Sequence, residues 1–293
     1  MSDTPPPRAC VIGWPIEHSR SPMIHGYWLK QLGLAGSYDK VAVRPEELRD
    51  FLLDLAARGY VGCNITVPHK ERAFEIIAAA NPEGVSRMAR ALSAVNTVWL
   101  DEAGRLNADN TDVEGFMAHF RACVPGWRAG GRHVLVIGAG GAARAIVAGF
   151  AEAGAGRVTI ANRTEEKARK LAEELGAAFD APLAAAPLDA LPAHMEQADV
   201  LVNATSLGMK GQPPLKLDLA PLPPHAVVAD IVYVPLRTAL LKQAQERGLA
   251  TVDGLGMLLH QAVPGFARWF GARPEVTDEL RQIIEADIAA TEG

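Results

Sequence analysis

The stretch HVLVIGAGGAARAIVAGF, residues 133–150, decides how the second half of the chain folds. A short aliphatic run typical of a buried strand leads directly into a glycine-rich turn, and a helix-like segment follows. The turn reads Gly138-x-Gly140-x-x-Ala143. In such a turn the first glycine allows a tight bend, the second admits a pyrophosphate, and the small third residue lets the helix pack on the strand. The stretch predicts a dinucleotide-binding turn, and a purely structural glycine turn stays open as the alternative.

The next expected strand ends in VTIANRT, residues 158–164, and carries a second cofactor signal. Asn162, Arg163 and Thr164 stand where an NAD-binding chain usually has Asp or Glu. A carboxylate would repel a 2′-phosphate, whereas a guanidinium and a hydroxyl can bind one. We therefore expect NADP as the cofactor. Lys167 could add positive charge one helical turn later, or could be an ordinary solvated lysine.

Strand-like and helix-like segments alternate along the rest of the chain. Strands are expected at 9–14, 38–43, 60–67, 94–100, 199–206 and 226–233, with helices after Pro22, from Arg44, from His69, and near the C-terminus. A Pro-rich loop is expected at 212–224. This βα alternation predicts an α/β fold with parallel or mostly parallel sheets, and 293 residues suffice for two domains.

Composition excludes several classes of function. The net charge of −5 and the absence of a Lys/Arg cluster argue against a nucleic-acid partner. The N-terminal MSDTPPPRAC has no apolar signal core, and no apolar run is long enough to span a bilayer. Cys10, Cys63 and Cys123 lack C-x-x-C spacing and have apolar neighbours, so we expect buried thiols in a cytoplasmic protein. The histidines show no metal-ligand spacing, so no metal is expected.

The segment HSRSP, residues 18–22, places two serines around an arginine at an expected helix start. Ser21 and Pro22 fit an N-cap and a first-turn proline, which leaves Ser19 without a structural role. A helix start with spare hydroxyls and unpaired N–H groups can also hold an anion, such as a substrate carboxylate. On this stretch alone both interpretations stay open.

Two charged residues are candidates for catalysis. In NITVPHKERAF, residues 64–74, Pro68 as an early helical residue places Lys70 in the first helical turn. A cation there opposes the helix dipole, which functional sites tolerate, although a surface lysine of no consequence is the alternative. Asp112 lies inside Thr111-x-x-Glu114, which has the pattern of a capping box. Taken alone, Asp112 is therefore more simply a helix-start acid.

Nine short motifs occur in an order that resembles the shikimate dehydrogenase family. They are VIGWPIEHSRSP, CNITVPHK, SAVNT, DNTD, GAGGAA, NRT, NATSLGM, DIVYVP and GLGMLLHQA, and the resemblance runs from about residue 11 to residue 262. It implies NADP-dependent reversible reduction of 3-dehydroshikimate to shikimate, in aromatic amino-acid biosynthesis. It also implies a two-domain α/β fold, with an N-terminal α/β substrate domain at 1–108, completed by C-terminal helices at 241–293, and a Rossmann-type NADP-binding domain with a parallel sheet at 109–240.

The resemblance assigns roles to single residues. It places Lys70 and Asp112 at the ring hydroxyls as catalytic residues, and Ser19 and Ser21 at the substrate carboxylate. The other implied substrate contacts are Asn64, Thr66, Asn96, Asp112, Tyr233 and Gln261. The implied cofactor contacts are Gly138, Ala139, Gly140, Gly141, Ala142, Asn162, Arg163, Thr164, Lys167, Ile231 and Gly254. The chain departs from the family pattern at Gly26, where Asn is common, and at Val234, where Asn commonly precedes the proline.

Three rival functions stay open. An NAD-using quinate/shikimate dehydrogenase is disfavoured by the Asn-Arg-Thr at 162–164. A methylene-tetrahydrofolate or amino-acid dehydrogenase of similar plan would not need serines at 19 and 21. A non-catalytic binding paralogue would not need both Lys70 and Asp112. The expected partner is a small-molecule substrate, and both a monomer and a homodimer are compatible with the sequence.

Overall fold

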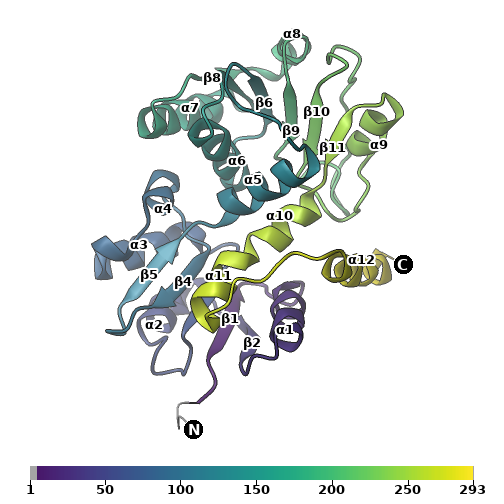
Figure 1. Cartoon of the computed structure of the whole chain (residues 1–293). Helices are drawn as coiled ribbons and strands as arrows, with labels where there is room; N and C mark the ends of the chain where they lie inside the picture. Colours follow the sequence, from purple (N-terminus) through teal and green to yellow (C-terminus); the bar gives the residue numbers. More distant parts are fainter. Residues whose placement is uncertain (1–4, 293) are drawn as a thin grey trace. The chain divides into compact units, whose positions relative to one another are not determined.

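The computed structural model describes residues 5–292, which form two compact units (Figure 1). The first unit comprises the chain up to Thr111 together with Gln261–Ile284. The second comprises Asp112–His260 together with the residues from Glu285 on. Each unit has its own sheet and its own core, so each is described by itself.

A five-stranded sheet of order β2-β1-β3-β4-β5 organises the first unit. Strand β1 pairs in parallel with β2 and β3, whereas the β3–β4 and β4–β5 pairings are antiparallel. The sheet is therefore mixed, and the expectation of a mostly parallel sheet is wrong for this unit, because β4 runs antiparallel to β3 and a hairpin then joins β4 to β5. The strands are β1 (Arg8–Gly13), β2 (Ser37–Ala42), β3 (Gly62–Ile65), β4 (Thr97–Leu100) and β5 (Leu106–Asp109).

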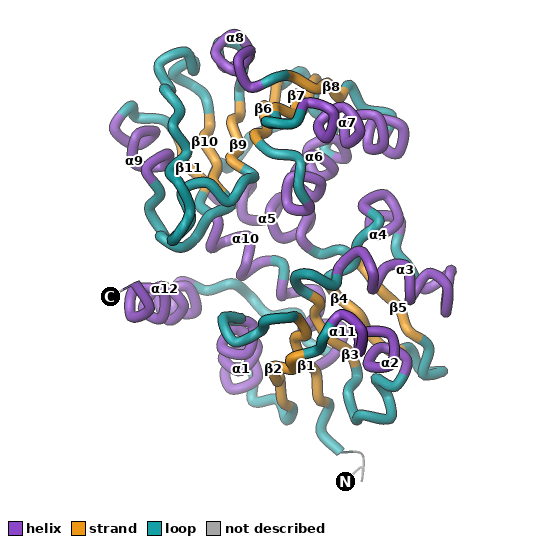
Figure 2. Tube along the Cα trace, turned by 180° about the vertical axis from the view of Figure 1, so that it is seen from behind, coloured by secondary structure: helices purple, strands orange, loops and turns teal. Residues whose placement is uncertain are grey.

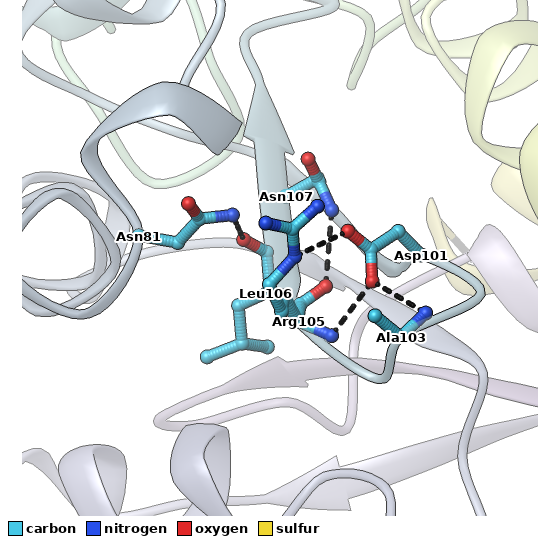
Figure 3. A network of polar contacts seen from close by, with 6 residues as sticks. All are labelled: Asn81, Asp101, Ala103, Arg105, Leu106 and Asn107. Atoms are coloured by element: carbon cyan, nitrogen blue, oxygen red, sulfur yellow. Dashed lines mark hydrogen bonds and ion pairs between the residues drawn. The ribbon is translucent and has the colours of Figure 1, made fainter.

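The turn between β4 and β5 is held by one carboxylate (Figure 3). Asp101 Oδ1 accepts hydrogen bonds from the backbone N–H groups of Ala103 at 3.0 Å and Arg105 at 2.9 Å. Its Oδ2 accepts from Arg105 Nε at 2.9 Å. Asn81 Nδ2 donates to the Leu106 carbonyl at 3.0 Å, which ties the start of β5 to the end of a neighbouring helix. Side chains that satisfy the backbone groups of a turn stabilise a tight reversal, and this reversal makes the β4–β5 pairing antiparallel.

Helices surround this sheet and bury its apolar residues. Cys10 and Cys63 lie opposite each other on β1 and β3 and are fully buried, which confirms that expectation for these two cysteines. The helix expected from Arg44 is shorter than its pattern suggested. Helical structure ends at Leu53, and residues 54–59 form turns. The helices are α1 (Ser21–Gln31), η1 (Pro45–Glu47), α2 (Leu48–Leu53), α3 (Lys70–Ala80), η2 (Pro82–Gly84), α4 (Arg87–Leu92), α11 (Ala262–Phe270) and α12 (Asp278–Glu292), the last extending into the second unit.

A six-stranded sheet of order β11-β10-β9-β6-β7-β8 organises the second unit, and every pairing in it is parallel. Figure 2 shows these strands in orange with the connecting helices in purple. The order is that of a doubly wound Rossmann sheet, in which ligands bind where the strand order reverses, here between β6 and β9. The strands are β6 (His133–Ile137), β7 (Arg157–Ala161), β8 (Leu183–Ala186), β9 (Val200–Asn203), β10 (Val227–Asp230) and β11 (Ala250–Val252).

The boundary of the second unit differs from the expected 109–240. Strand β11 pairs with β10, so residues 250–252 complete this sheet and do not join the C-terminal helices of the first unit. The division falls at Gln261, between α10 and α11. The helices of the unit are α5 (Asp112–Cys123), α6 (Gly141–Glu152), α7 (Glu165–Phe179), η3 (Leu188–Ala190), α8 (Leu191–Met195), α9 (Ala239–Glu246) and α10 (Gly254–His260). Within residues 5–292, no helix has the length and apolar character needed to cross a membrane.

Helices α5 and α10 meet closely around His119. A Cβ added at Gly256 would lie 2.0 Å from the His119 ring, so only glycine lets α10 approach at this point. His119 Nε2 lies 3.6 Å from Asp253 Oδ1, and the Cys123 sulfur lies 3.5 Å from the same nitrogen. Cys123 is exposed at the last residue of α5, so the expectation that all three cysteines are buried is wrong for this one.

This contact predicts a pH-dependent stability. Burial alone lowers the pKa of His119, but hydrogen bonds to Asp253 and Cys123 outweigh it and raise the pKa from 6.5 to about 9. Because the folded protein binds this proton more tightly, the stabilisation is complete below pH 6.5 and is lost as the pH rises through about 9. We expect chemical unfolding at pH 6 to 9 to show a loss on the order of 3 kcal/mol that His119→Gln lacks. The exposed His18→Gln is the matched control for the loss of one histidine. An equal dependence of the unfolding free energy on pH in wild type and His119→Gln would contradict the assignment.

Candidate functional site

The two serines of the HSRSP segment lie at the start of α1, but their roles differ from the capping interpretation. Helix α1 begins at Ser21, and the residue before it, Arg20, has helical backbone angles. Ser21 is therefore the first helical residue and not the N-cap. The hydroxyl of Ser19 accepts the backbone N–H of Ser21 at 3.4 Å, so Ser19 does have a structural contact. Ser21 is buried and Ser19 partly exposed, which leaves the Ser19 hydroxyl accessible beside the helix start.

A buried aromatic stack lies behind this helix start. The imidazole of His25 stacks on the ring of Tyr38 with centroids 3.9 Å apart, and burial lowers the pKa of His25 to about 3. The Tyr38 hydroxyl donates to Asn64 Oδ1 at 2.5 Å. Asn64 Nδ2 in turn donates to the Asn96 carbonyl at 3.0 Å. The neutral histidine and the tyrosine therefore fix the amide of Asn64, one of the expected substrate contacts.

Asn96 belongs to a second buried network. Its Oδ1 accepts the backbone N–H of Thr111 at 2.8 Å and the Thr111 hydroxyl lies 3.1 Å from the same atom. That hydroxyl also donates to the Gln261 carbonyl at 2.8 Å, and Asn96 Nδ2 donates to Gln261 Oε1 at 3.4 Å. The structure thus brings together Asn96 and Gln261, which are far apart in the sequence. Thr111 joins them, and sequence reasoning missed this because it treated Thr111 only as a capping residue.

Lys70 and Thr66 lie on the segment that leaves β3. Thr66 N donates to the Ile12 carbonyl at 3.0 Å, and a Cβ at Gly13 would lie 2.6 Å from Thr66 Cγ2. Lys70 is the first residue of α3, as expected, although Pro68 precedes the helix and does not belong to it. His69, immediately before Lys70, is buried, and its Nε2 hydrogen-bonds the Val43 carbonyl at 2.7 Å. These contacts anchor the backbone that leads into the lysine, which is itself partly exposed.

The glycine turn of the second unit has the geometry that its sequence predicts. Gly138 adopts φ +115°, and a Cβ there would lie 3.0 Å from the Ala204 carbonyl oxygen. Gly140 is the N-cap of α6, and Gly141 its first residue; a Cβ at either would meet nothing within 4 Å. The start of α6 is therefore open to a ligand, and its unpaired N–H groups together with the helix dipole favour a phosphate there. The buried Ala143 packs α6 on the sheet.

The expected 2′-phosphate contacts follow β7. Asn162 Nδ2 donates to the Thr164 carbonyl at 2.9 Å and shapes the turn into α7. Arg163 and Thr164 are exposed, and so is Lys167 in the first turn of α7. Within residues 5–292, neither Arg163 nor Lys167 forms an ion pair, whereas Arg169 on the same helix pairs with Glu165 and Glu166. The residues therefore fit an NADP phosphate better than they fit an internal ion pair.

Ile231, Tyr233 and Gly254 gather beyond the end of β10. A Cβ at Gly254 would lie 2.1 Å from the Ile231 carbonyl oxygen and 2.9 Å from that of Val232. Only glycine permits this approach, so Gly254 at the start of α10 defines the path of the Ile231 backbone. Asp112 is the first residue of α5 in the same unit and is partly exposed. Asp112 and Tyr233 are thus the expected substrate contacts of the second unit; the others belong to the first unit.

These residue types are suited to reducing a ketone on a polar ring. The side-chain amides of Asn64, Asn96 and Gln261 can hydrogen-bond ring hydroxyls, and a lysine ammonium can donate a proton to an oxygen that gains charge. The glycine turn can hold a dinucleotide whose nicotinamide supplies a hydride. The geometry therefore supports an oxidoreductase.

Three family models match the chain. They describe a shikimate dehydrogenase substrate binding domain at residues 11–98, a shikimate / quinate 5-dehydrogenase at 126–209 and a shikimate 5'-dehydrogenase C-terminal domain at 254–283. A shikimate dehydrogenase (NADP(+)) of Methylocella silvestris is 57% identical over 282 residues, 96% of this chain and 97% of that protein.

Solved structures agree with these matches. A shikimate 5-dehydrogenase from Thermus thermophilus, in complex with NADP(H) and shikimate, is 36% identical with a TM-score of 0.80, over 96% of this chain and 99% of the other. A quinate dehydrogenase from Corynebacterium glutamicum, in complex with NAD, is 29% identical with a TM-score of 0.86, over 97% and 100% of the two chains. The relatives thus include both substrate and cofactor combinations that the sequence left open.

The Thr111 network yields a stability prediction. Thr111→Val removes the hydroxyl but keeps the shape, so the Gln261 carbonyl loses its donor within a buried site. We expect a loss of about 1–3 kcal/mol in the free energy of unfolding, measured by urea titration. Thr111→Ser keeps the hydroxyl and should retain most of that stability. Equal losses in the two variants would mean that the methyl group, and not the hydrogen bonds, stabilises this segment.

Proposed function

Because the chain belongs to the shikimate dehydrogenase family, we propose that it catalyses the reversible, NADP-dependent reduction of 3-dehydroshikimate to shikimate. The observation that carries the proposal is 57% identity, over 96% of the chain, to a relative described as shikimate dehydrogenase (NADP(+)). The substrate is a small polyol acid, and the polar residues of the first unit are of the types that bind one. The free thiols fit a reducing compartment, so we place the reaction in the cytoplasm.

In the proposed mechanism NADPH supplies the hydride, and the side chains supply binding, orientation and the proton. Lys70 donates a proton to the carbonyl oxygen of the substrate as that oxygen gains negative charge. Asp112 accepts a hydrogen bond from a neighbouring ring hydroxyl and orients it. In the reverse direction Lys70 takes the proton back, and Asp112 again holds the hydroxyl. Both residues begin helices, α3 and α5, so their backbones are rigid.

The remaining residues bind and orient the substrate in this proposal. Ser19 and Ser21 hold the substrate carboxylate at the start of α1. Asn64, Thr66, Asn96, Tyr233 and Gln261 hydrogen-bond the ring. The support for Asn64 and Asn96 is that hydrogen bonds to neighbouring residues already fix both amides, so little conformational entropy is lost on binding.

On the cofactor side, Gly138, Ala139, Gly140, Gly141 and Ala142 would hold the pyrophosphate at the start of α6. Asn162, Arg163, Thr164 and Lys167 would surround the 2′-phosphate, and Ile231 and Gly254 would lie at the nicotinamide end. The second candidate is quinate oxidation with NAD, because a quinate dehydrogenase in complex with NAD shares the fold over 97% of this chain. The exposed Arg163 favours NADP over that alternative.

The role of Lys70 is tested by its removal. Lys70→Ala should lower shikimate-dependent NADP reduction by about a hundredfold to ten-thousandfold, the usual contribution of a general acid or base. Shikimate affinity should fall much less, because several other groups hold the substrate. Arg72→Ala is the matched control, an exposed cation on the same helix that pairs with Glu75. A Lys70→Ala enzyme that retained more than half of the wild-type turnover would refute the assignment.

The role of Arg163 is tested through the cofactor ratio. Arg163→Ala should weaken NADP use roughly tenfold to hundredfold, the equivalent of about 1.5–3 kcal/mol for a hydrogen bond to a charged group. NAD lacks the phosphate, so its use should barely change. The measurement is kcat/KM with each cofactor, with Arg169→Ala as the matched cation control on α7. An unchanged ratio of kcat/KM values would mean that another residue binds the 2′-phosphate, and Lys167 would be the next candidate.

A further inference from the structure

Two loops leave the carboxyl edge of the parallel sheet side by side, residues 204–212 after β9 and residues 231–238 after β10. The last residues of the two strands, Asn203 and Asp230, are paired neighbours. Asn203 Nδ2 donates to Asp230 Oδ1 at 2.9 Å, and the two residues are 0% and 2% exposed. A buried amide and a buried carboxylate thus meet where both loops begin.

The amide of Asn203 determines the start of the first loop. Its Oδ1 accepts both the backbone N–H and the hydroxyl of Thr205, at 3.1 and 2.7 Å. Its Nδ2 donates to the Leu207 carbonyl at 3.1 Å as well as to Asp230. Asn203 therefore uses its donors and its acceptor fully, and every partner except Asp230 lies in the loop.

The carboxylate of Asp230 does the same for the second loop. Its Oδ1 also accepts the backbone N–H of Val232 at 3.0 Å, and its Oδ2 accepts the Thr238 hydroxyl at 2.7 Å. Thr238 is 1% exposed and caps α9. Both ends of the segment 231–238 are thereby fixed to one side chain. Ile231 and Tyr233 lie on either side of Val232 within that segment.

Strand pairing does not require this carboxylate. The backbone already pairs β9 with β10 from Val227 to Asp230, and apolar side chains would bury there at lower cost. Burial raises the pKa of Asp230 to about 6, although hydrogen bonds from Thr238, Val232 and Asn203 lower it. Burying an acid that ionises near neutral pH costs folding free energy, so the hydrogen bonds that Asp230 makes to the two loops are the feature that needs explaining.

The two loops are also joined to each other and to the glycine turn. Lys210 N donates to the Val234 carbonyl at 2.8 Å, beyond the Asn203–Asp230 pair. A Cβ at Gly138 would lie 3.0 Å from both the Ala204 carbonyl oxygen and Thr205 Cγ2. The loop after β9 therefore borders the expected pyrophosphate site, while the loop after β10 carries Ile231 and Tyr233.

We propose that Asn203 and Asp230 are positioning residues of the dehydrogenase. They act by holding the two loops in fixed positions beside the glycine turn. The inference rests on the proposed function, because it assumes that Ile231 and Tyr233 contact the reactants. Because Asn203 and Asp230 are 0% and 2% exposed, this proposal has them act without touching cofactor or substrate. Their side chains hold the backbone from which those contacts are made.

The test compares Asp230→Ala with Asp230→Asn. Alanine removes every acceptor, and both loops lose their common anchor. In Asp230→Asn the remaining Oδ1 can still accept hydrogen bonds from Asn203 and Val232. The new Nδ2 amide group faces the Thr238 hydroxyl in place of the second carboxylate oxygen. We expect Asp230→Ala to lower kcat/KM for NADP and shikimate about a hundredfold, as a misplacement of about an ångström can. Asp230→Asn should recover most of that loss.

Val228→Ala is the matched control for stability. Val228 lies two residues before Asp230 on the same strand and is fully buried, so the variant weakens the core without touching the loop anchors. Its thermal midpoint should fall, and its kcat/KM should stay near the wild-type value when assayed well below that midpoint. Equal decreases of kcat/KM in Val228→Ala and Asp230→Ala would mean that Asp230 acts only through the stability of the fold. That result would overturn the proposal.

Hydrogen exchange of the unliganded protein provides a second readout, independent of turnover. The backbone amides of Thr205, Leu207 and Val232 should exchange faster in Asp230→Ala than in wild type, while those of β6 and β7 stay protected. Unchanged exchange in both loops would contradict the proposal even if activity fell. A wild-type enzyme inactive on shikimate would refute the proposed function instead, and faster loop exchange in Asp230→Ala would still show that the pair holds the loops.

Discussion

The carboxyl edge of the six-stranded sheet, where the cofactor is expected, depends on one close approach. The Gly138 turn lies against the backbone that follows β9. Gly138 has φ +115°, and any Cβ there would lie 3.0 Å from the Ala204 carbonyl oxygen. A side chain would therefore strain the turn and push the loop away. The approach occurs where the strand order reverses between β6 and β9, which is the ligand-binding position of such sheets. The open start of α6, the loops after β9 and β10, and the exposed Arg163 are all placed relative to it along the same sheet edge.

Buried polar side chains hold the loops of both units, in similar ways. In the first unit Asn96, Thr111 and Gln261 connect the end of the sheet to the start of α11. In the second, Asn203 and Asp230 connect two strand ends to the loops that follow them. Nearly every donor and acceptor in these networks has a partner, so the networks specify one geometry and do not merely add stability. Loops held in this way can present binding groups with little loss of entropy.

Local patterns in the sequence predicted the parts of the molecule that local physics determines. The glycine turn, the parallel sheet of the second unit and the place of Lys70 in a first helical turn are confirmed, because each depends on a few adjacent residues. The first sheet is mixed because β4 runs antiparallel to both of its neighbours, which the pattern did not reveal, and Ser21 proved not to be the N-cap. The three-residue β11 was too short to detect. Thr111 and Asp230 could not be recognised, since their partners lie up to 150 residues away for Thr111 and 27 for Asp230.

We propose that this chain oxidises shikimate with NADP and reduces 3-dehydroshikimate with NADPH. The most direct test is a comparison of kcat/KM for four combinations: shikimate or quinate as substrate, each with NADP or NAD. Shikimate with NADP should give the highest kcat/KM, and exchanging either the substrate or the cofactor should lower it. A higher kcat/KM for quinate with NAD, or no cofactor reduction with shikimate, would refute NADP-dependent shikimate oxidation as the function.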